Sequence, residues 1–141
     1  MNKSVMKVGL LGLGTVGSGT MQIIQTNQEE ISRKIGSELR ITKALVRDLG
    51  KERPNLDPHI QLTTDAQAII ADPEIDIVVE VMGGIEPARS YIAAALTNGK
   101  YVVTANKDLM ATHGSELLLL AQKQNRGIFY EASVGGGIPL I

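Results

Sequence analysis

Short apolar runs alternate with amphipathic stretches along the whole of this 141-residue chain. Runs that are continuously apolar, or that alternate, predict strands, and apolar positions three and four residues apart predict helices. Strands are expected at residues 5–11, 40–46, 75–82, 101–105 and 128–134. Helices are expected at residues 15–35, 65–71, 86–98 and 107–125, the last with a possible break near Gly114. Residues 50–64 read as a polar loop with two prolines.

This alternation predicts one α/β domain over residues 1–141, built on a doubly wound parallel sheet. Right-handed crossovers place helices on both faces of such a sheet. Five strands are predicted, whereas a full dinucleotide-binding fold of the Rossmann type usually has six. The chain is therefore expected to stop where the nucleotide-binding domain would end, truncated before a substrate domain.

Residues at the predicted helix ends fit this assignment. Thr64 or Asp65 can cap the helix at 65–71, and Asn106 can cap the helix at 107–125. Gly99 follows the helix at 86–98, where helices commonly end on a residue with positive φ. One face of that helix is apolar and consists of Ala88, Ile92, Ala95 and Leu96.

Eight of the fifteen glycines follow the ends of three predicted strands. They are Gly12, Gly14 and Gly17, then Gly83 and Gly84, then Gly135, Gly136 and Gly137. Ligands of open parallel sheets bind outside the carboxyl ends of the strands, and glycine lets the backbone approach a ligand closely. The glycines therefore predict a binding site along this edge of the sheet.

The first cluster, Gly12-Leu13-Gly14-Thr15-Val16-Gly17, has the spacing G-x-G-x-x-G between a predicted strand and a predicted helix. Dinucleotide-binding proteins need these glycines for a tight turn, for approach to the pyrophosphate and for helix packing. The helix amino end then offers free N–H groups to the phosphates. A turn of small residues without a ligand is the alternative, but strand, turn and helix together favour a dinucleotide.

Arg47 and Asp48 follow the second predicted strand, where such proteins distinguish NAD from NADP. An arginine there can bind the 2′-phosphate of NADP, and Lys51 and Arg53 add positive charge nearby. Asp48 is expected to point to the opposite side, although it keeps NAD open as a cofactor. The alternative for Arg47 is a solvated charge at a strand end.

Two further charged residues lie near predicted strand ends. Lys107 falls in the first turn of its helix, where the helix dipole disfavours a cation, so it is either a functional lysine or an ordinary exposed one. Glu131 interrupts an apolar strand just before three glycines, whose carbonyls could join it around a hard cation. The alternative is that Glu131 faces solvent at a sheet edge.

Composition narrows the function classes. A net charge of −1 without a basic run, one Phe, three Tyr and no Trp argue against a nucleic-acid surface. The absence of Cys excludes disulfides and thiolate metal sites and fits a cytoplasmic protein. His59 and His113 have no second ligand at metal spacing, and the apolar runs are too short to cross a membrane.

Five segments together resemble the homoserine dehydrogenase family. They are GLLGLGTVGSG at 9–19, ALVRD at 44–48, VVEVMGG at 78–84, TANK at 104–107 and YEASVGGGIPLI at 130–141. The resemblance covers the whole chain but only the amino-terminal, nucleotide-binding part of the family. It implies an oxidoreductase that interconverts L-homoserine and L-aspartate 4-semialdehyde with NADP(H) or NAD(H), in the pathway to threonine and methionine.

The resemblance also implies roles for single residues. Thr15 and Val16 would contact the cofactor in the turn, Arg47 the adenosine phosphate, and Lys107 the nicotinamide, the substrate and the proton-transfer network. A sodium site would consist of Glu131 and the carbonyls of Val134, Gly136 and Ile138. The family's substrate-binding acids and second catalytic lysine come from a later domain, through which its members are usually homodimers. The fragment is therefore expected to bind cofactor without turnover.

Two other functions stay open at this point. One is a different nicotinamide-dependent dehydrogenase of amino acids or sugars, against which the TANK and EASVGGGIP segments speak. The other is a regulatory nucleotide-sensing module, like the ligand-gating domains of potassium channels. Such modules usually carry an acid at the end of the second strand, where this chain has Val46 and Arg47.

Overall fold

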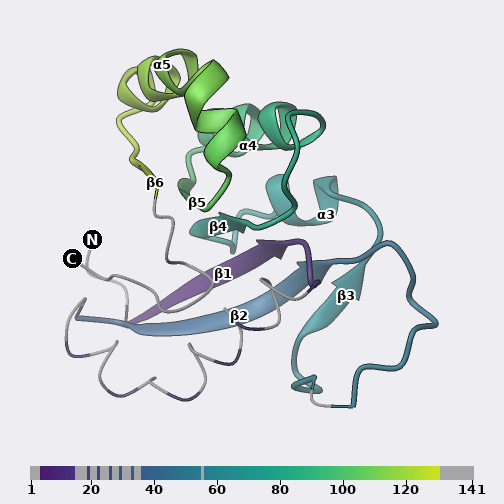
Figure 1. Cartoon of the computed structure of the whole chain (residues 1–141). Helices are drawn as coiled ribbons and strands as arrows, with labels where there is room; N and C mark the ends of the chain where they lie inside the picture. The colour runs from purple at the N-terminus through teal and green to yellow at the C-terminus, as the bar shows by residue number, and fades with distance from the viewer. Residues whose placement is uncertain are drawn as a thin grey trace.

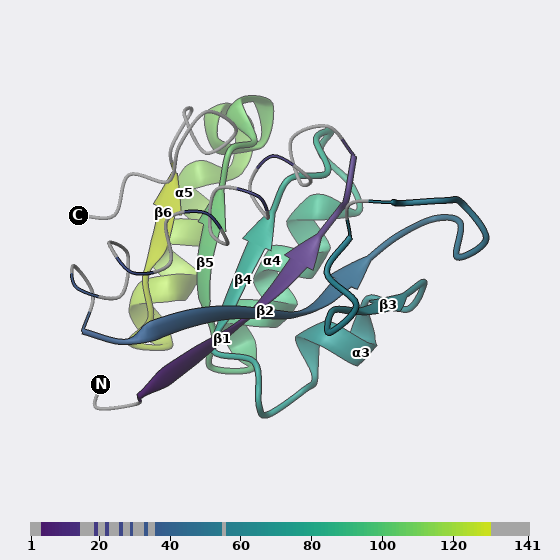
Figure 2. The same cartoon turned by 90° about the horizontal axis from the view of Figure 1, so that it is seen from below.

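The computed structural model describes residues 4–14, 36–54 and 56–130, together with positions 19, 22, 26, 29 and 33. Within them, six parallel strands form one sheet in the order β3-β2-β1-β4-β5-β6 (Figures 1 and 2). The strands are β1 (Val5–Leu11), β2 (Glu38–Leu45), β3 (Gln61–Thr63), β4 (Ile77–Glu80), β5 (Tyr101–Thr104) and β6 (Ile128–Tyr130). This order is that of the dinucleotide-binding fold, and it confirms the predicted fold class.

Three helices are described in full: α3 (Gln67–Ile70), α4 (Ala88–Thr97) and α5 (Lys107–Lys123). The five described positions inside the helix predicted at 15–35 are also helical. The part of the last predicted strand beyond Tyr130 lies outside the described residues. In the described part of the chain, no helix combines the length and the apolar character needed to cross a membrane.

The polar loop predicted at 50–64 is wrong at its carboxyl end, because residues 61–63 form β3. This strand has three residues and pairs only with β2, at the edge of the sheet. A single apolar residue, Leu62, cannot show a period of two, so pairing with β2 decides the structure here. The described sheet therefore has the usual six strands, and the strand missing from the prediction is β3.

Two details of the helices also differ from expectation. α5 runs without a break through Gly114, which is buried and where an added Cβ would meet the Met110 side chain at 3.5 Å. Packing of the helix therefore outweighs the low helix propensity of glycine. α3 starts at Gln67 with Ala66 as its N-cap, although the Asp65 carboxylate still accepts a hydrogen bond from the Gln67 N–H at 3.0 Å.

The sheet carries apolar side chains on both faces. α3, α4 and α5 lie on one face (Figure 1), and the predicted apolar face of α4 is buried there. Successive residues of β4 face opposite sides of the sheet: Val78 packs into the apolar cluster under these helices, and Val79 packs into the cluster on the other face. Gly99, at φ +79°, ends α4 as predicted. The packed strands hold their carboxyl ends in line along one edge.

Candidate functional site

A cleft of about 690 Å³ lies at the carboxyl edge of the sheet, a size typical of small-ligand sites. Its walls come from the turns after β1, β2, β3 and β4 and from the first turns of α4. Residues that represent these five segments are Gly12, Arg47, Thr64, Met82 and Tyr91. The predicted binding edge is thus hollowed around the first strand, as ligand binding at the carboxyl ends of parallel strands requires.

Gly12 and Gly14 both line this cleft. Gly12 has φ of +112°, and a Cβ there would lie 3.3 Å from the Val81 carbonyl oxygen. Gly14 has no described atom within 4 Å of its Cβ position, so space there is open toward the cleft. The first glycine therefore shapes the turn, and the second leaves room for a ligand beside the backbone.

Positive charge gathers at the end of the cleft next to β2. Arg47, Lys51 and Arg53 line it together with one acid, Asp48. Asp48 lines the same cleft, and its Oδ1 accepts a hydrogen bond from the Gly50 N–H at 2.9 Å. The direction of its side chain relative to Arg47 stays a prediction. Three cations against one engaged carboxylate suit a phosphate group.

The second half of the edge is organised around Glu80, which is fully buried at the end of β4. Its Oε2 accepts hydrogen bonds from the N–H groups of Met82 and Gly83 at 2.9 and 3.1 Å. Its Oε1 accepts one from the Thr104 hydroxyl. The sequence analysis missed this residue, although its pattern, an acid inside the apolar run 78–82, is the same that marked Glu131.

Asn106 joins this acid to α5. Its Oδ1 accepts a hydrogen bond from the Leu109 N–H at 3.1 Å, which confirms the predicted N-cap. Its Nδ2 donates to the carbonyl of Gly84 at 2.6 Å and lies 3.4 Å from Glu80 Oε2. The amide group therefore fastens the Gly83–Gly84 turn, where both residues have positive φ, to the start of the helix.

Lys107 is the first residue of α5 and is exposed at the carboxyl edge. It stands beside Asn106, but neither it nor Gly83 and Gly84 are among the residues that line the cleft. The structure thus brings Gly12, Gly14 and Arg47 into one cavity. It places the other three predicted residues in the neighbouring part of the edge, which Asn106 connects.

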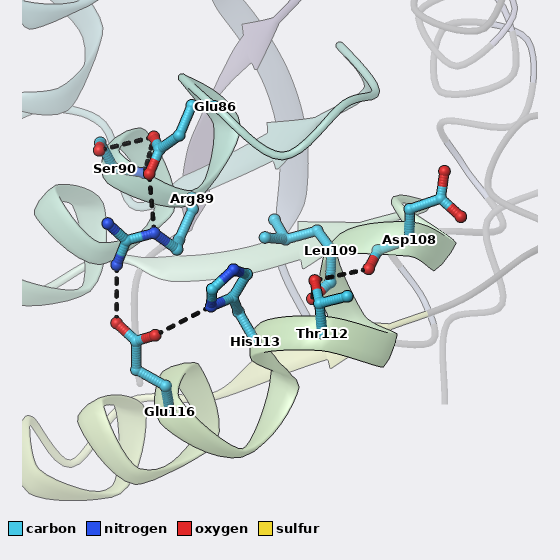
Figure 3. A network of polar contacts seen from close by, with 8 residues as sticks. All are labelled: Glu86, Arg89, Ser90, Asp108, Leu109, Thr112, His113 and Glu116. Atoms are coloured by element: carbon cyan, nitrogen blue, oxygen red, sulfur yellow. Dashed lines mark hydrogen bonds and ion pairs between the residues drawn. The ribbon is translucent and has the colours of Figure 1, made fainter.

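Ion pairs tie α4 to α5 on the outer surface (Figure 3). Arg89 donates to Glu86 at 2.7 Å and to Glu116 at 2.8 Å. The Ser90 hydroxyl, and then Arg89, hold the pKa of Glu86 below its usual value, and Glu86 and Glu116 raise that of Arg89. The half-buried His113 lies 3.2 Å from Glu116.

The other predicted site residues lie outside the described residues. They are Thr15, Val16 and Gly17 of the phosphate turn and Glu131, Val134, Gly136 and Ile138 of the cation site. Within the part of the chain that the structure describes, no three His, Cys, Asp or Glu side chains form a group that could hold a metal ion. His59 is exposed and lies 3.0 Å from Asp57.

Comparison with known proteins gives a consistent result. Residues 12–131 match the family described as "Homoserine dehydrogenase, NAD binding domain". The chain is 50% identical over 136 residues to homoserine dehydrogenase of Bacillus subtilis (strain 168), covering 96% of the chain and 31% of that protein. For the enzyme of Synechocystis sp. the identity is 48% over 137 residues, with the same coverage. The chain thus spans about a third of the length of these relatives.

Solved structures agree in fold. The crystal structure of a homoserine dehydrogenase from Thiobacillus denitrificans superposes with a TM-score of 0.85 at 48% identity, covering 92% of this chain and 30% of that one. A hyperthermophilic archaeal homoserine dehydrogenase in complex with NADPH gives a TM-score of 0.73 at 26% identity, covering 92% of this chain and 44% of that one.

Proposed function

Because the chain belongs to the homoserine dehydrogenase family and matches its NAD-binding domain, we propose that it binds NADP(H) in the cleft at the carboxyl edge. The observation that carries the proposal is the turn after β1, where Gly12 makes the bend and no described atom lies within 4 Å of a Cβ at Gly14. The charged end of the cleft lies next to it. Glycine turn and cations together suit a ligand with several phosphates.

Preference for NADP(H) over NAD(H) is part of this proposal. Arg47, Lys51 and Arg53 line the end of the cleft next to β2, where the ribose of the adenosine half is expected. Asp48, which could otherwise bind ribose hydroxyls, accepts a hydrogen bond from the Gly50 N–H. The archaeal relative with NADPH, at 26% identity, is consistent with this choice. NAD(H) remains the weaker expected ligand.

We further propose that the complete protein interconverts L-homoserine and L-aspartate 4-semialdehyde. The cofactor, when bound, supplies hydride exchange at its nicotinamide ring. Gly12, Gly14, Thr15, Val16 and Gly17 would hold its pyrophosphate. Lys107, at the exposed start of α5, would contact the substrate and help to move its proton.

Two parts of the proposal concern residues or partners beyond the described structure. Glu131, with the carbonyls of Val134, Gly136 and Ile138, is proposed to hold sodium, because carboxylate and carbonyl oxygens suit hard cations. The complete protein is proposed to be a homodimer through the domain that follows in its relatives. A polypeptide of these 141 residues is expected to bind cofactor without turnover, since it covers about a third of those relatives.

Calorimetric titration of NADPH and NADH into the 141-residue polypeptide, with an assay of homoserine oxidation, tests the proposal. We expect saturable binding of NADPH, weaker binding of NADH and no turnover. Absence of binding at millimolar NADPH would refute the binding part. Binding of another nucleotide in preference to both would favour a sensing module, and robust turnover would refute the inactivity of the isolated domain.

A further inference from the structure

Glu80 is a buried anion with an unusually complete set of donors. Its side chain is fully buried, and four groups point their hydrogens at its two oxygens. These are the N–H groups of Met82 and Gly83, the Thr104 hydroxyl and the Asn106 amide. A carboxylate offers about four acceptor positions, and these donors match that number, the Asn106 amide at the longest distance, 3.4 Å. Charge-assisted bonds of this kind are about twice as strong as neutral ones.

The four donors belong to two segments of the binding edge. Met82, which lines the cleft, and Gly83 form the turn after β4, while Thr104 and Asn106 lead from β5 into α5. The Thr104 hydroxyl also accepts a hydrogen bond from the Asn106 N–H at 3.0 Å. One carboxylate therefore orients the cleft wall and the start of the helix that carries Lys107.

The hydrogen bonds of Glu80 hold backbone groups in place that a ligand would otherwise have to order when it binds. Gly83 and Gly84 have φ of +79° and +75°, and no described atom lies within 4 Å of their Cβ positions. Met82 and Ile85, on either side of these glycines, pack against the apolar cluster under the helices. The glycines themselves have no side chain to pack, and hydrogen bonds to Glu80 and Asn106 hold their backbone. A site whose backbone is held in advance loses less entropy on binding.

We propose that Glu80 is a positioning residue of the dinucleotide site, which it preorganises as a buried charge through the turn after β4 and the start of α5. The proposal rests on the proposed cofactor binding. Glu80→Gln preserves the shape of the side chain but removes the charge. One of its two oxygens becomes an NH2 group, which cannot accept a hydrogen bond from the donors that face it.

The competing explanation is that Glu80 only stabilises the fold, and a half-buried ion pair elsewhere in the domain supplies the control. Asp72, between α3 and β4 at the opposite edge of the sheet, lies 2.8 Å from Lys43 Nζ. Asp72→Asn removes a charge from the same domain without touching the cleft. Thr104 provides a further pair of variants. Thr104→Val removes the hydroxyl that donates a hydrogen bond to Glu80, and Thr104→Ser retains it.

The test compares these variants of the 141-residue polypeptide by NADPH affinity, thermal unfolding and amide hydrogen exchange. Glu80→Gln and Thr104→Val should raise the Kd for NADPH about tenfold, equivalent to about 1.4 kcal/mol. They should also speed the exchange of the Met82 and Gly83 amides about tenfold. Thr104→Ser and Asp72→Asn should leave both quantities near wild type, although Asp72→Asn lowers the unfolding temperature.

Each contrary result has a separate meaning. If the wild type does not bind NADPH, the proposed function fails first. If it binds and both Glu80→Gln and Thr104→Val keep the wild-type Kd, Glu80 does not position the site. If Asp72→Asn weakens binding as much as Glu80→Gln, the effect reflects stability and the proposal is likewise wrong. Should Glu80→Gln fail to fold, the Thr104→Val and Thr104→Ser pair decides alone.

Discussion

At the scale of single residues, Gly12 and Gly14 illustrate how one motif combines two physical demands. Gly12 has a backbone conformation that side chains disfavour, and the Val81 carbonyl lies close by. Gly14 is free of both constraints among the described residues and faces the open cleft. The first demand concerns folding of the turn and the second concerns only the ligand, so mutation can separate them.

Gly12→Ala is expected to destabilise the protein by about 1–3 kcal/mol, since it forces a non-glycine residue to φ of +112°. Gly14→Ala should leave stability almost unchanged but weaken NADPH binding at least about tenfold, because its methyl group occupies ligand space. Chemical denaturation and calorimetry measure the two effects. Equal loss of stability in both variants would contradict this division of roles.

Arg47→Ala should weaken NADPH binding about tenfold and leave NADH binding nearly unchanged, because one charge-assisted contact contributes about 1.5–3 kcal/mol and this one is exposed. Added salt should reduce the difference between the cofactors. Arg47→Lys retains the charge but not the planar donor pair, so its NADPH affinity should lie between those of the wild type and Arg47→Ala. If both cofactors weaken equally, Arg47 supports the loop; if the wild type prefers NADH, Asp48 binds the ribose.

Lys107→Ala, in a complete enzyme that carries this domain, should lower kcat by about 10²–10⁴-fold, the usual contribution of a general acid or base. The Kd for NADPH should change far less. Lys123→Ala, in the last turn of the same helix, is the matched control. A Lys107→Ala rate within a factor of about two of the parent would identify Lys107 as an ordinary surface lysine.

At the scale of elements, the amino-terminal edge of the sheet is held by charged side chains. Lys43 Nζ on β2 donates to the Ala68 carbonyl at 2.9 Å and pairs with Asp72 at 2.8 Å. Lys100, which is buried just before β5, donates to the carbonyls of Asp72 and Ile75 at 2.5 and 2.8 Å. These bonds connect β2, α3, β4 and β5, away from the binding edge.

The pair of Asp72 and Lys43 makes the stability of the fold depend on pH in the acidic range. The hydrogen bond from Lys43, and then the one from the Glu74 N–H, hold the pKa of Asp72 below its ordinary value of 3.8. A depressed folded-state pKa adds stability that is present above pH 3.8 and is lost as pH falls through the folded value. Asp72→Asn should therefore reduce stability by about 1–2 kcal/mol at neutral pH.

Asp72→Asn also tests the predicted direction of this pH dependence. The difference between wild type and Asp72→Asn should shrink as pH falls below 3.8 and vanish once the carboxyl is protonated. Urea denaturation across this range measures it, and NADPH affinity at neutral pH should not change. A difference that stays constant with pH would show that packing, rather than charge, holds Asp72.

At the scale of the whole molecule, pattern alone predicts the parallel sheet, the apolar face of α4, the cap at Asn106 and the glycine turn. Each depends on neighbours along the chain. β3 could not be predicted, because three residues acquire their structure from pairing with β2. The turn that joins Asp48 to the Gly50 N–H was not predicted either. Glu80 is visible in the sequence as an acid among apolar residues, but two of its partners, Thr104 and Asn106, lie 24 and 26 residues further along the chain.

The central claim is that this chain binds a dinucleotide along the carboxyl edge of its sheet, and NMR titration of the labelled 141-residue polypeptide with NADPH tests it most directly. Amide shifts should gather at Gly12, Gly14, Arg47, Met82 and Gly83. They should spare the opposite edge, represented by Ser37, Asp76 and Lys100. Saturable shifts confined to the carboxyl edge are the predicted result. Shifts centred on the opposite edge, or none at millimolar NADPH, would contradict the account.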